Sequence, residues 1–288
     1  MDLFQNKCYF IIKIRKNRAF FALKRVFMYL SGVKMPANEM PPLSLVGESH
    51  QGRVRSHNED NFVCISLFPG YYFAAVADGV GGHSGGEVAS YLCCHRLLLD
   101  WKKLFRSNPE PTEAMLARFM IDSVLSANSD IFSANTEHKR GMPMCTTLAA
   151  AIFTPQMVIV AHAGDSRVYC RSKNKCMQLT VDHTVENELN EQGITDPRYL
   201  PGSHVISRAV GPFVKLRPEI HTYFRHPEDR YLLCTDGLTN YWSTEEIGEN
   251  LTGCQTAREA NNRFVRETLR RGAIDNVTVI SVFPVSEQ

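Results

Sequence analysis

Two hydrophobic periodicities occur in blocks along the chain, and each block predicts one kind of element. Short runs rich in β-branched, aromatic and small apolar residues, bounded by Gly, Pro or Asp, predict strands. These runs cover residues 61–68, 71–78, 146–153, 157–164, 167–172, 230–236 and 276–283. Apolar residues that recur every three or four positions predict helices over 86–105, 112–136 and 256–271.

The order of these elements favours one fold class. Helices follow helices and strands follow strands, and the strands 146–153 and 157–164 are separated by only three residues, which predicts a hairpin. Such segregation is typical of α+β proteins rather than of alternating βαβ units. We therefore expect sheets packed on each other and covered by helices.

Composition and charge divide the chain into two parts. The 288 residues are 44% hydrophobic and 22% charged, enough for a full core. Residues 1–34 carry a net charge of +7 and the rest −5, so nucleic acid is not an expected partner. The sequence "MPANEMPP" (35–42) is typical of a linker, and we expect the domain proper over 43–286 after an extension over 1–42.

The extension itself leaves three interpretations open. It mixes apolar and basic residues, and no uncharged run reaches the roughly 18 residues of a membrane span. A helix that binds a membrane surface is one interpretation. A loosely ordered extension is the second, and an upstream start codon with Met28 or Met35 as the true first residue is the third. Membrane contact is expected only through residues 1–34.

The nine cysteines indicate the compartment. They include no CxxC pair and lie mostly in apolar runs, so we expect buried thiols without disulfides. Disulfides are rare in reducing compartments. The sequence therefore predicts a cytoplasmic protein.

Candidate chemistry appears at the ends of the predicted strands, where five aspartates lie: Asp60, Asp78, Asp165, Asp236 and Asp275. Two packed sheets can bring several strand ends to one rim, and rigid carboxylates suit hard divalent cations. Gly79 and Gly237 each follow one of these aspartates and would let the backbone turn sharply beside an ion. A single Asp-Gly is typical of an ordinary turn; the joint pattern favours a metal site.

Eight blocks carry a resemblance to a known family, and they stand in one order along residues 45–283: "GRVRSHNEDNF", "VADGVGGHSGGEVAS", "CTTLAAAIF", "AHAGDSRVY", "LTVDHT", "ISRAVG", "LLCTDGL" and "DNVTVISV". The chain resembles the PPM-type (type 2C) metal-dependent serine/threonine protein phosphatases, most closely their bacterial branch. The resemblance implies a sandwich of two antiparallel sheets flanked by helices, in four layers αββα.

The resemblance also implies a metal site. Two Mn²⁺ or Mg²⁺ ions would be bridged by Asp78, with the backbone carbonyl of Gly79 on one ion. Asp236 and Asp275 would hold the first ion, and Glu59 would reach the second largely through water.

Two further residues have roles that the resemblance implies. Asp60 would orient metal-bound waters, and Arg55 would bind the substrate phosphate, because a planar guanidinium can contact two oxygens.

The implied activity is hydrolysis of phosphoserine and phosphothreonine in proteins by direct attack of a metal-bridging hydroxide. The enzyme would oppose a bacterial serine/threonine kinase, and its substrates would include that kinase or its targets. Two alternatives stay open on the same fold: a catalytically silent binding module, and a regulatory phosphatase dedicated to one partner.

Two departures from the family leave questions open. Val80 stands where many eukaryotic members have a histidine, so the proton donor is either a metal-bound water, which we favour, or His83. Asp165 lies where some members hold a third ion, but "TEHKRGMPM" (136–144) lacks the aspartate that often helps, and "CTT" replaces "GTT". Whether a third ion binds stays open.

Two other features complete the sequence-based expectations. Residues 183–207 fall where the family has a flap, with a short helix that ends at Gly193. A role in substrate selection and a plain surface hairpin are both open for it. His162 is expected to be a hydrogen-bonded histidine of the sheet rather than a ligand.

Overall fold

The computed structural model describes residues 40–81, 85–137, 142–173, 175–196 and 205–285. All of them belong to one compact unit, Met35–Gln288. The predictions for the extension, including its contact with membranes, concern residues 1–39 and so lie outside the described residues.

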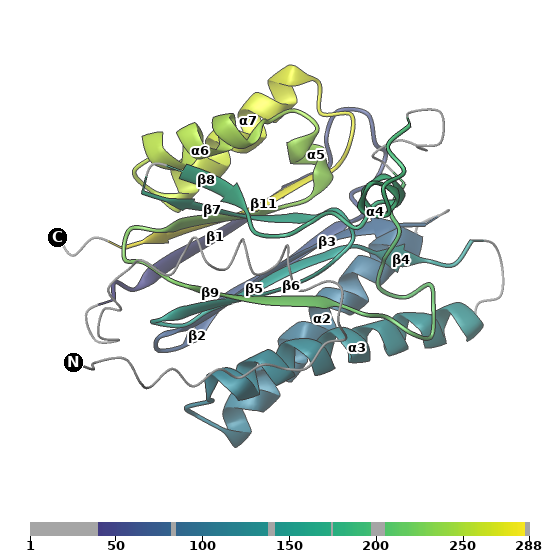
Figure 1. Cartoon of the computed structure of the whole chain (residues 1–288), viewed down its shortest axis with the longest axis horizontal. Coiled ribbons are helices and arrows are strands. Elements are labelled where there is room, and N and C mark those ends of the chain that lie inside the picture. Colours follow the sequence, from purple (N-terminus) through teal and green to yellow (C-terminus); the bar gives the residue numbers. More distant parts are fainter. Residues whose placement is uncertain (1–39, 82–84, 138–141, 174, 197–204, 286–288) are drawn as a thin grey trace. The chain divides into compact units, whose positions relative to one another are not determined.

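Two antiparallel sheets form the centre of this unit (Figure 1). The first sheet has five strands, in spatial order β1 (Leu43–His50), β11 (Val277–Pro284), β10 (Arg230–Cys234), β7 (Arg167–Ser172) and β8 (Lys175–Gln178). The second sheet has the order β2 (Asp60–Phe68), β3 (Tyr71–Val80), β5 (Leu148–Phe153), β6 (Met157–Ala163) and β9 (Glu219–Phe224), with β4 (Cys145–Thr146) paired to β3.

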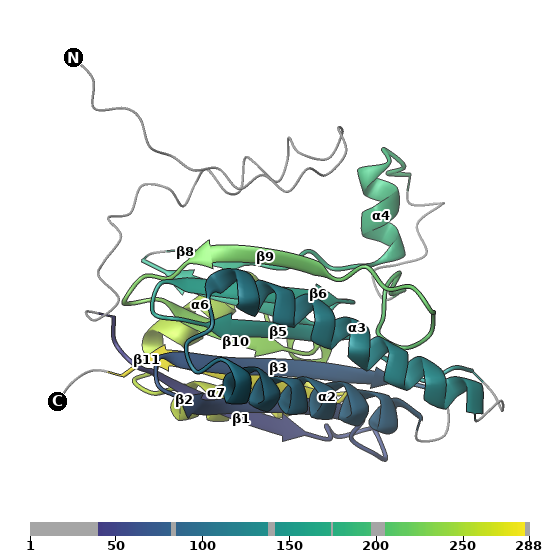
Figure 2. The ribbon, with the colours of Figure 1, turned by 90° about the horizontal axis from the view of Figure 1, so that it is seen from below.

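Helices cover the outer face of each sheet. The long helices α2 (Gly85–Ser107) and α3 (Glu113–Glu137) lie across the second sheet, as Figure 2 shows from below. The first sheet is covered by α6 (Thr244–Gly253) and α7 (Ala257–Arg271), with the short α5 (Asp236–Thr239) nearby (Figure 1). The remaining helix of the described residues, α4 (Val185–Glu191), follows β8.

Three apolar cores separate these four layers. Strand β3 shows how the sequence specifies them, because successive side chains of a strand point to opposite faces. Phe73 and Ala75 pack toward α2 and α3, whereas Ala74 and Val76 pack between the sheets. A third core joins the first sheet to α6 and α7, and Trp242 lies in it. The expected α+β sandwich with four layers is therefore confirmed.

Most predicted elements are present with shifted ends, and a few were not predicted. The hairpin of β5 and β6 pairs as expected. Strands β1, β8 and β9 and helices α5 and α6 had no sequence prediction. The eight cysteines among the described residues are free, as expected.

Candidate active site

Five aspartates lie at the ends of strands or in the segments next to them, and we call them the carboxylate rim: Asp60, Asp78, Asp165, Asp236 and Asp275. Asp60 and Asp78 lie directly opposite each other in the pairing of β2 with β3. The backbone of Asp78 is fixed by Thr147, whose N–H donates to its carbonyl at 2.8 Å. The Asp78 N–H in turn donates to the Thr147 hydroxyl at 3.0 Å.

Asp60 is the most enclosed member by solvent exposure, at 6%. Its Oδ2 accepts hydrogen bonds from the hydroxyls of Thr235, the residue after β10, at 2.9 Å and of Thr278 in β11 at 2.6 Å. Its Oδ1 is buried and has no hydrogen-bond partner among the described residues. Burial, which disfavours the charged form, raises the pKa of Asp60 to about 7.

Asp236 begins a helix, which corrects the prediction that it ends a strand. Strand β10 stops at Cys234, Thr235 is the N-cap, and Asp236 is the first residue of α5. The acid thereby lies in the first turn of a helix, where the backbone N–H groups favour a negative charge only weakly, because α5 is short.

The two glycines that follow rim aspartates serve close packing rather than a sharp turn, which corrects a second prediction. A Cβ on Gly237 would lie 1.9 Å from the carbonyl oxygen of Asn276. A Cβ on Gly79 would lie 2.1 Å from the carbonyl oxygen of Gly86. Neither Gly79 nor Gly237 is among the glycines with positive φ. Both positions need glycine because another backbone segment fills the space.

The loop that carries Arg55 and Glu59 is held by one side chain. The Asn276 amide donates to the carbonyls of Gln51 at 2.8 Å and His57 at 2.9 Å. Its Oδ1 accepts from the Glu59 N–H at 2.8 Å. Asn276, the residue before β11, therefore holds three backbone groups of the loop in place.

Arg55 approaches the rim through Asp275. Its Nη2 donates to Asp275 Oδ2 at 2.8 Å, and 52% of its side chain remains exposed. This hydrogen bond raises the pKa of Arg55, so the guanidinium stays charged. An anchored but exposed guanidinium can bind an anion from solution.

Electrostatic coupling shows that the rim aspartates lie near one another. The pKa of Asp78 is raised well above its usual value, first by burial and then by Asp60, Asp236, Asp165 and Asp275. Although this burial effect dominates, Asp78 as a whole residue is only half-buried. Like charges this close destabilise the fold unless a cation compensates them.

Glu59 belongs to the same region. Burial raises its pKa, and Asp275 and Glu87 raise it further, while Arg55 lowers it. The Glu59 carbonyl accepts from the Gly79 N–H at 3.2 Å and from the Ser90 hydroxyl at 2.6 Å. These bonds tie the Glu59 backbone to β3 and α2.

Asp165 lies between β6 and β7. Burial and the charge of Asp236 raise its pKa to about 6. The neighbouring Ser166 hydroxyl shares a 2.7 Å hydrogen bond with Thr147, the residue that fixes Asp78. The arginine of "GDSR", Arg167, binds Asp182 with Nε and Nη2 and so has a structural partner.

The proton donor and the flap are only partly described. Val80 is 42% exposed and offers no proton, and His83 lies outside the described residues. In the flap, α4 ends at Glu191, and Gly193 has φ +85°. The flap residues 197–204 and residues 138–141 of the "TEHKRGMPM" stretch also lie outside, so the flap's role and the third ion stay predictions.

Sequence reasoning missed the residues that position the acids: Thr147, Thr235, Thr278, Asn276 and Ser90. Each is a polar residue within or beside an apolar strand or at a helix start, and the four other than Asn276 are at most 2% exposed. Buried polar side chains need partners. That need is the signal that could have identified them.

Comparison with known proteins identifies the family. The model for "Protein phosphatase 2C" matches residues 46–275. The chain belongs to the protein phosphatase 2C family. It is 32% identical over 235 residues to the serine/threonine phosphatase stp of Listeria monocytogenes, covering 81% of this chain and 92% of that one. The predicted family and class of enzyme, a serine/threonine phosphatase, are confirmed.

Solved structures agree with this membership of the protein phosphatase 2C family. The crystal structure of the Mycobacterium tuberculosis serine/threonine phosphatase PstP/Ppp has a TM-score of 0.73 at 31% identity, over 85% of this chain and 99% of that one. A crystal structure of the PstP catalytic domain in complex with two manganese ions has a TM-score of 0.71 at 31% identity, with the same coverage. The predicted pair of Mn²⁺ or Mg²⁺ ions agrees with that complex.

One further observation concerns membranes. Among the described residues, every helix is too short or too polar to cross a bilayer.

Proposed function

We propose that this protein phosphatase 2C hydrolyses phosphoserine and phosphothreonine in bacterial cytoplasmic proteins, using two Mn²⁺ or Mg²⁺ ions at the carboxylate rim. Asp78 would bridge the ions, Asp236 and Asp275 would hold one, and Glu59 would reach the other. The carbonyl of Gly79 would complete the set of ligands. Two manganese ions in the related PstP support the number of ions.

The convergence of the rim aspartates carries this proposal. Five carboxylates from β2, β3, the β6–β7 connection, α5 and the start of β11 influence one another's charge. Oδ1 of Asp60 adds a buried acceptor that has no donor among the residues the structure describes. Oxygen ligands in this number fit hard divalent cations, which would offset the repulsion.

When bound, two such ions would supply Lewis acidity, lowering the pKa of water and offsetting negative charge on a phosphoryl group. The protein's own groups do the positioning. Arg55, fixed to Asp275 at 2.8 Å, can direct its remaining N–H groups to phosphate oxygens. Asp60, held by two threonine hydroxyls, presents its free Oδ1 in a fixed direction as an acceptor for a water proton.

The biological setting is part of the proposal. Relatives named serine/threonine phosphatases support phosphorylated proteins as substrates. We propose that a bacterial serine/threonine kinase, or its targets, is among them, and that the catalytic unit is the predicted domain over 43–286. The extension would contribute no catalytic group.

The test is hydrolysis of a phosphothreonine peptide by the full chain after its metals have been stripped with a chelator. We expect phosphate release that depends on added Mn²⁺ and stops again in excess chelator. Asp78→Asn should lose both turnover and manganese binding in equilibrium dialysis. Asp122→Asn, an exposed acid on α3, is the matched control and should behave as wild type.

Two results would contradict the proposal. Full activity in excess chelator would remove the metals from the reaction. Peptide binding without any phosphate release, at every Mn²⁺ and Mg²⁺ concentration, would favour the silent binding module.

A further inference from the structure

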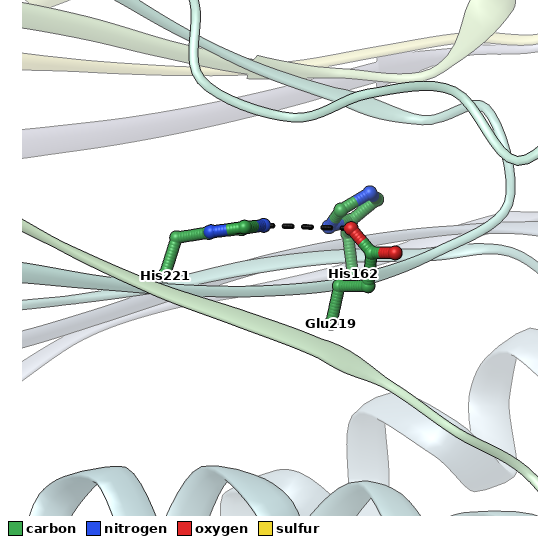
Figure 3. Close-up of side chains that lie close together, drawn as sticks. All are labelled: His162, Glu219 and His221. Carbon is green, nitrogen blue, oxygen red and sulfur yellow. Dashed lines mark hydrogen bonds and ion pairs between the residues drawn. The ribbon is translucent and has the colours of Figure 1, made fainter. Parts of the chain in front are cut away.

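A second group of ligand-type side chains lies on strands β6 and β9, and we call it the histidine cluster: His162, Glu219 and His221. His162 of β6 pairs directly with Glu219 of β9, and His221 lies two residues further on the same face of β9. One ligand atom of each lies within 4.8 Å of the others. Figure 3 shows His221 and Glu219 directed toward each other beside the imidazole of His162.

His162 has one ring nitrogen paired and one unpaired. Its Nε2 lies 2.9 Å from the carbonyl oxygen of Val181, an acceptor, so Nε2 carries the proton and donates. Nδ1 then holds a lone pair, and it is buried with no hydrogen-bond partner in the described part of the chain. Burial lowers the pKa of His162 to about 4, which keeps the ring neutral near pH 7. His162 is thus a hydrogen-bonded histidine of the sheet, as expected, but only at Nε2, because Nδ1 has no partner among the described residues.

A buried, neutral imidazole whose other nitrogen donates to a backbone carbonyl is prepared as a metal ligand. Metal-binding histidines almost always donate their second ring N–H to a carbonyl or carboxylate, which fixes the tautomer and the ring orientation. His162 has this arrangement, and it is 0% exposed. Its lone pair has no other assigned role.

Glu219 shows the same division of its two oxygens. Oε1 is held by Arg208 Nη1 at 3.1 Å and by His183 Nε2 at 3.4 Å. His183 Nδ1 accepts from the Gly164 N–H at 3.2 Å, so Nε2 carries the proton that points to Glu219. Oε2 faces His221 Nε2 at 3.4 Å instead. Contacts at Oε1 thus orient the Glu219 carboxylate, whereas Oε2 faces His221.

The distance between Glu219 and His221 suits a shared ion better than a direct hydrogen bond. Hydrogen bonds from nitrogen to oxygen cluster near 2.9–3.0 Å. Bonds of about 2.0–2.2 Å from Zn²⁺ in a tetrahedral site place two ligand atoms roughly 3.3–3.6 Å apart. The observed 3.4 Å falls in that range. Because all three ligand atoms lie within 4.8 Å of one another, a shift of at most roughly 1–1.5 Å would bring the third atom to the same spacing.

Access and donor type indicate the ion. Strand β9 is at the edge of its sheet, and the side chains of His221 and Glu219 are 39% and 35% exposed, so an ion can enter from solution. Two imidazoles and one carboxylate suit Zn²⁺ and similar transition metals, whereas Mn²⁺ and Mg²⁺ prefer oxygen. Three protein ligands leave a fourth position for water.

We propose that His162, Glu219 and His221 bind one Zn²⁺ or similar transition-metal ion, separate from the ions of the carboxylate rim. The ion would fasten edge strand β9 to β6. The ion would also be linked to α4 through Arg208. This side chain contacts Glu219 of β9 at 3.1 Å and Glu188 of α4 at 3.3 Å.

The experiment uses the metal-stripped full chain with saturating Mg²⁺, to which Zn²⁺ is added in a calorimetric titration. We expect the wild-type protein to bind one more Zn²⁺ per chain than His221→Ala and to show a larger rise in melting temperature. His95→Ala removes an exposed histidine of α2 and should keep the extra ion. Glu219→Gln keeps the shape but should weaken binding at least about tenfold.

Cobalt gives an independent readout of the ligands. Co²⁺ bound to nitrogen in a four-coordinate site absorbs visible light much more strongly than Co²⁺ in a six-coordinate oxygen site. The strong absorption should be present in wild type and His95→Ala and absent in His221→Ala. Unchanged Mn²⁺-dependent phosphatase activity in His221→Ala would show that the variant folds and that the rim is intact.

Three results would overturn the proposal. They are equal Zn²⁺ uptake by wild type and a folded His221→Ala, equal loss of the extra ion in His95→Ala, and undiminished affinity in Glu219→Gln. If His221→Ala does not fold, Glu219→Gln alone decides between binding and no binding.

Discussion

The carboxylate rim and the histidine cluster lie on the same sandwich but are built in opposite ways. In the rim, burial and then repulsion from the neighbouring aspartates raise the pKa of Asp78. In the cluster, His162 is neutral, and interactions with His183 and then His221 lower the pKa of Glu219. The rim therefore needs cations to relieve repulsion, whereas the cluster is stable without one and offers a lone pair.

This difference teaches how one chain could keep two kinds of metal apart. Oxygen donors at the rim favour hard ions such as Mn²⁺ and Mg²⁺, and nitrogen donors at the cluster favour Zn²⁺. Selectivity would come from the donors, because both sites are reached from solution. The predictions below test each half of this contrast.

The largest effect is expected for Asp236→Asn at the rim. Loss of a proposed direct ligand should lower phosphate release by more than the roughly 10- to 100-fold seen for outer-shell partners. Circular dichroism should remain that of the wild type, because the amide keeps the shape of the carboxylate. Asp122→Asn is the control, and activity within a few-fold of wild type in Asp236→Asn would remove this residue from the site.

The second prediction concerns the cluster and uses metal-stripped protein. Because the pKa of His162 falls from 6.5 to about 4 on folding, the unfolded chain takes up the proton first as the pH decreases. The contribution of His162 to the free energy of unfolding should be present above pH 6.5 and be lost as the pH falls toward 4. Between pH 7 and pH 5 the free energy of unfolding should decrease by about 2 kcal/mol because of this residue.

Urea unfolding at the two pH values measures this slope. His162→Gln should show a smaller decrease than the wild type, and His95→Gln should show the same decrease. Equal slopes in wild type and His162→Gln would mean that His162 is not the neutral, buried ring described above.

A smaller effect is expected for Arg55→Lys. Lysine cannot contact Asp275 and two phosphate oxygens with one planar group, so kcat/KM should fall about tenfold, or about 1.4 kcal/mol. Arg53→Lys is the control two residues away, where the side chain donates to the carbonyl of Leu269. Steady-state kinetics on a phosphopeptide decides, and an unchanged KM and kcat would exclude Arg55 from phosphate binding.

The smallest effect is expected from removing residues 1–34. The compact unit Met35–Gln288 contains every residue of the rim and of the cluster. Rate constants on a soluble phosphopeptide and the difference in Zn²⁺ uptake should therefore not change. A large loss of either would make the extension part of that site.

Sequence patterns predicted the rim but not the cluster for a physical reason. The rim acids lie at strand ends or within two residues of them, next to apolar runs, and this pattern can be recognised in the sequence. Strand β9, "EIHTYF", was missed because Glu219 and His221 interrupt its apolar pattern. The cluster also depends on the register of β6 with β9, which brings together residues almost sixty positions apart.

The details of the rim needed the structure for a similar reason. Position 237 needs glycine because the carbonyl of Asn276 packs against it. This contact joins two backbone segments that are distant in the sequence, so no sequence spacing predicts it. Likewise, the threonines that hold Asp60 lie in β11 and directly after β10, and only the order of the strands brings them near β2.

The position of β11 has a consequence for synthesis on the ribosome. This last strand lies between β1 and β10, and Asn276 just before it holds the loop of Arg55 and Glu59. Until that stretch leaves the exit tunnel, the first sheet lacks its second strand and the arginine loop lacks its anchor. A nascent or truncated chain that lacks β11 should therefore be inactive, so that dephosphorylation begins only after this strand has been made.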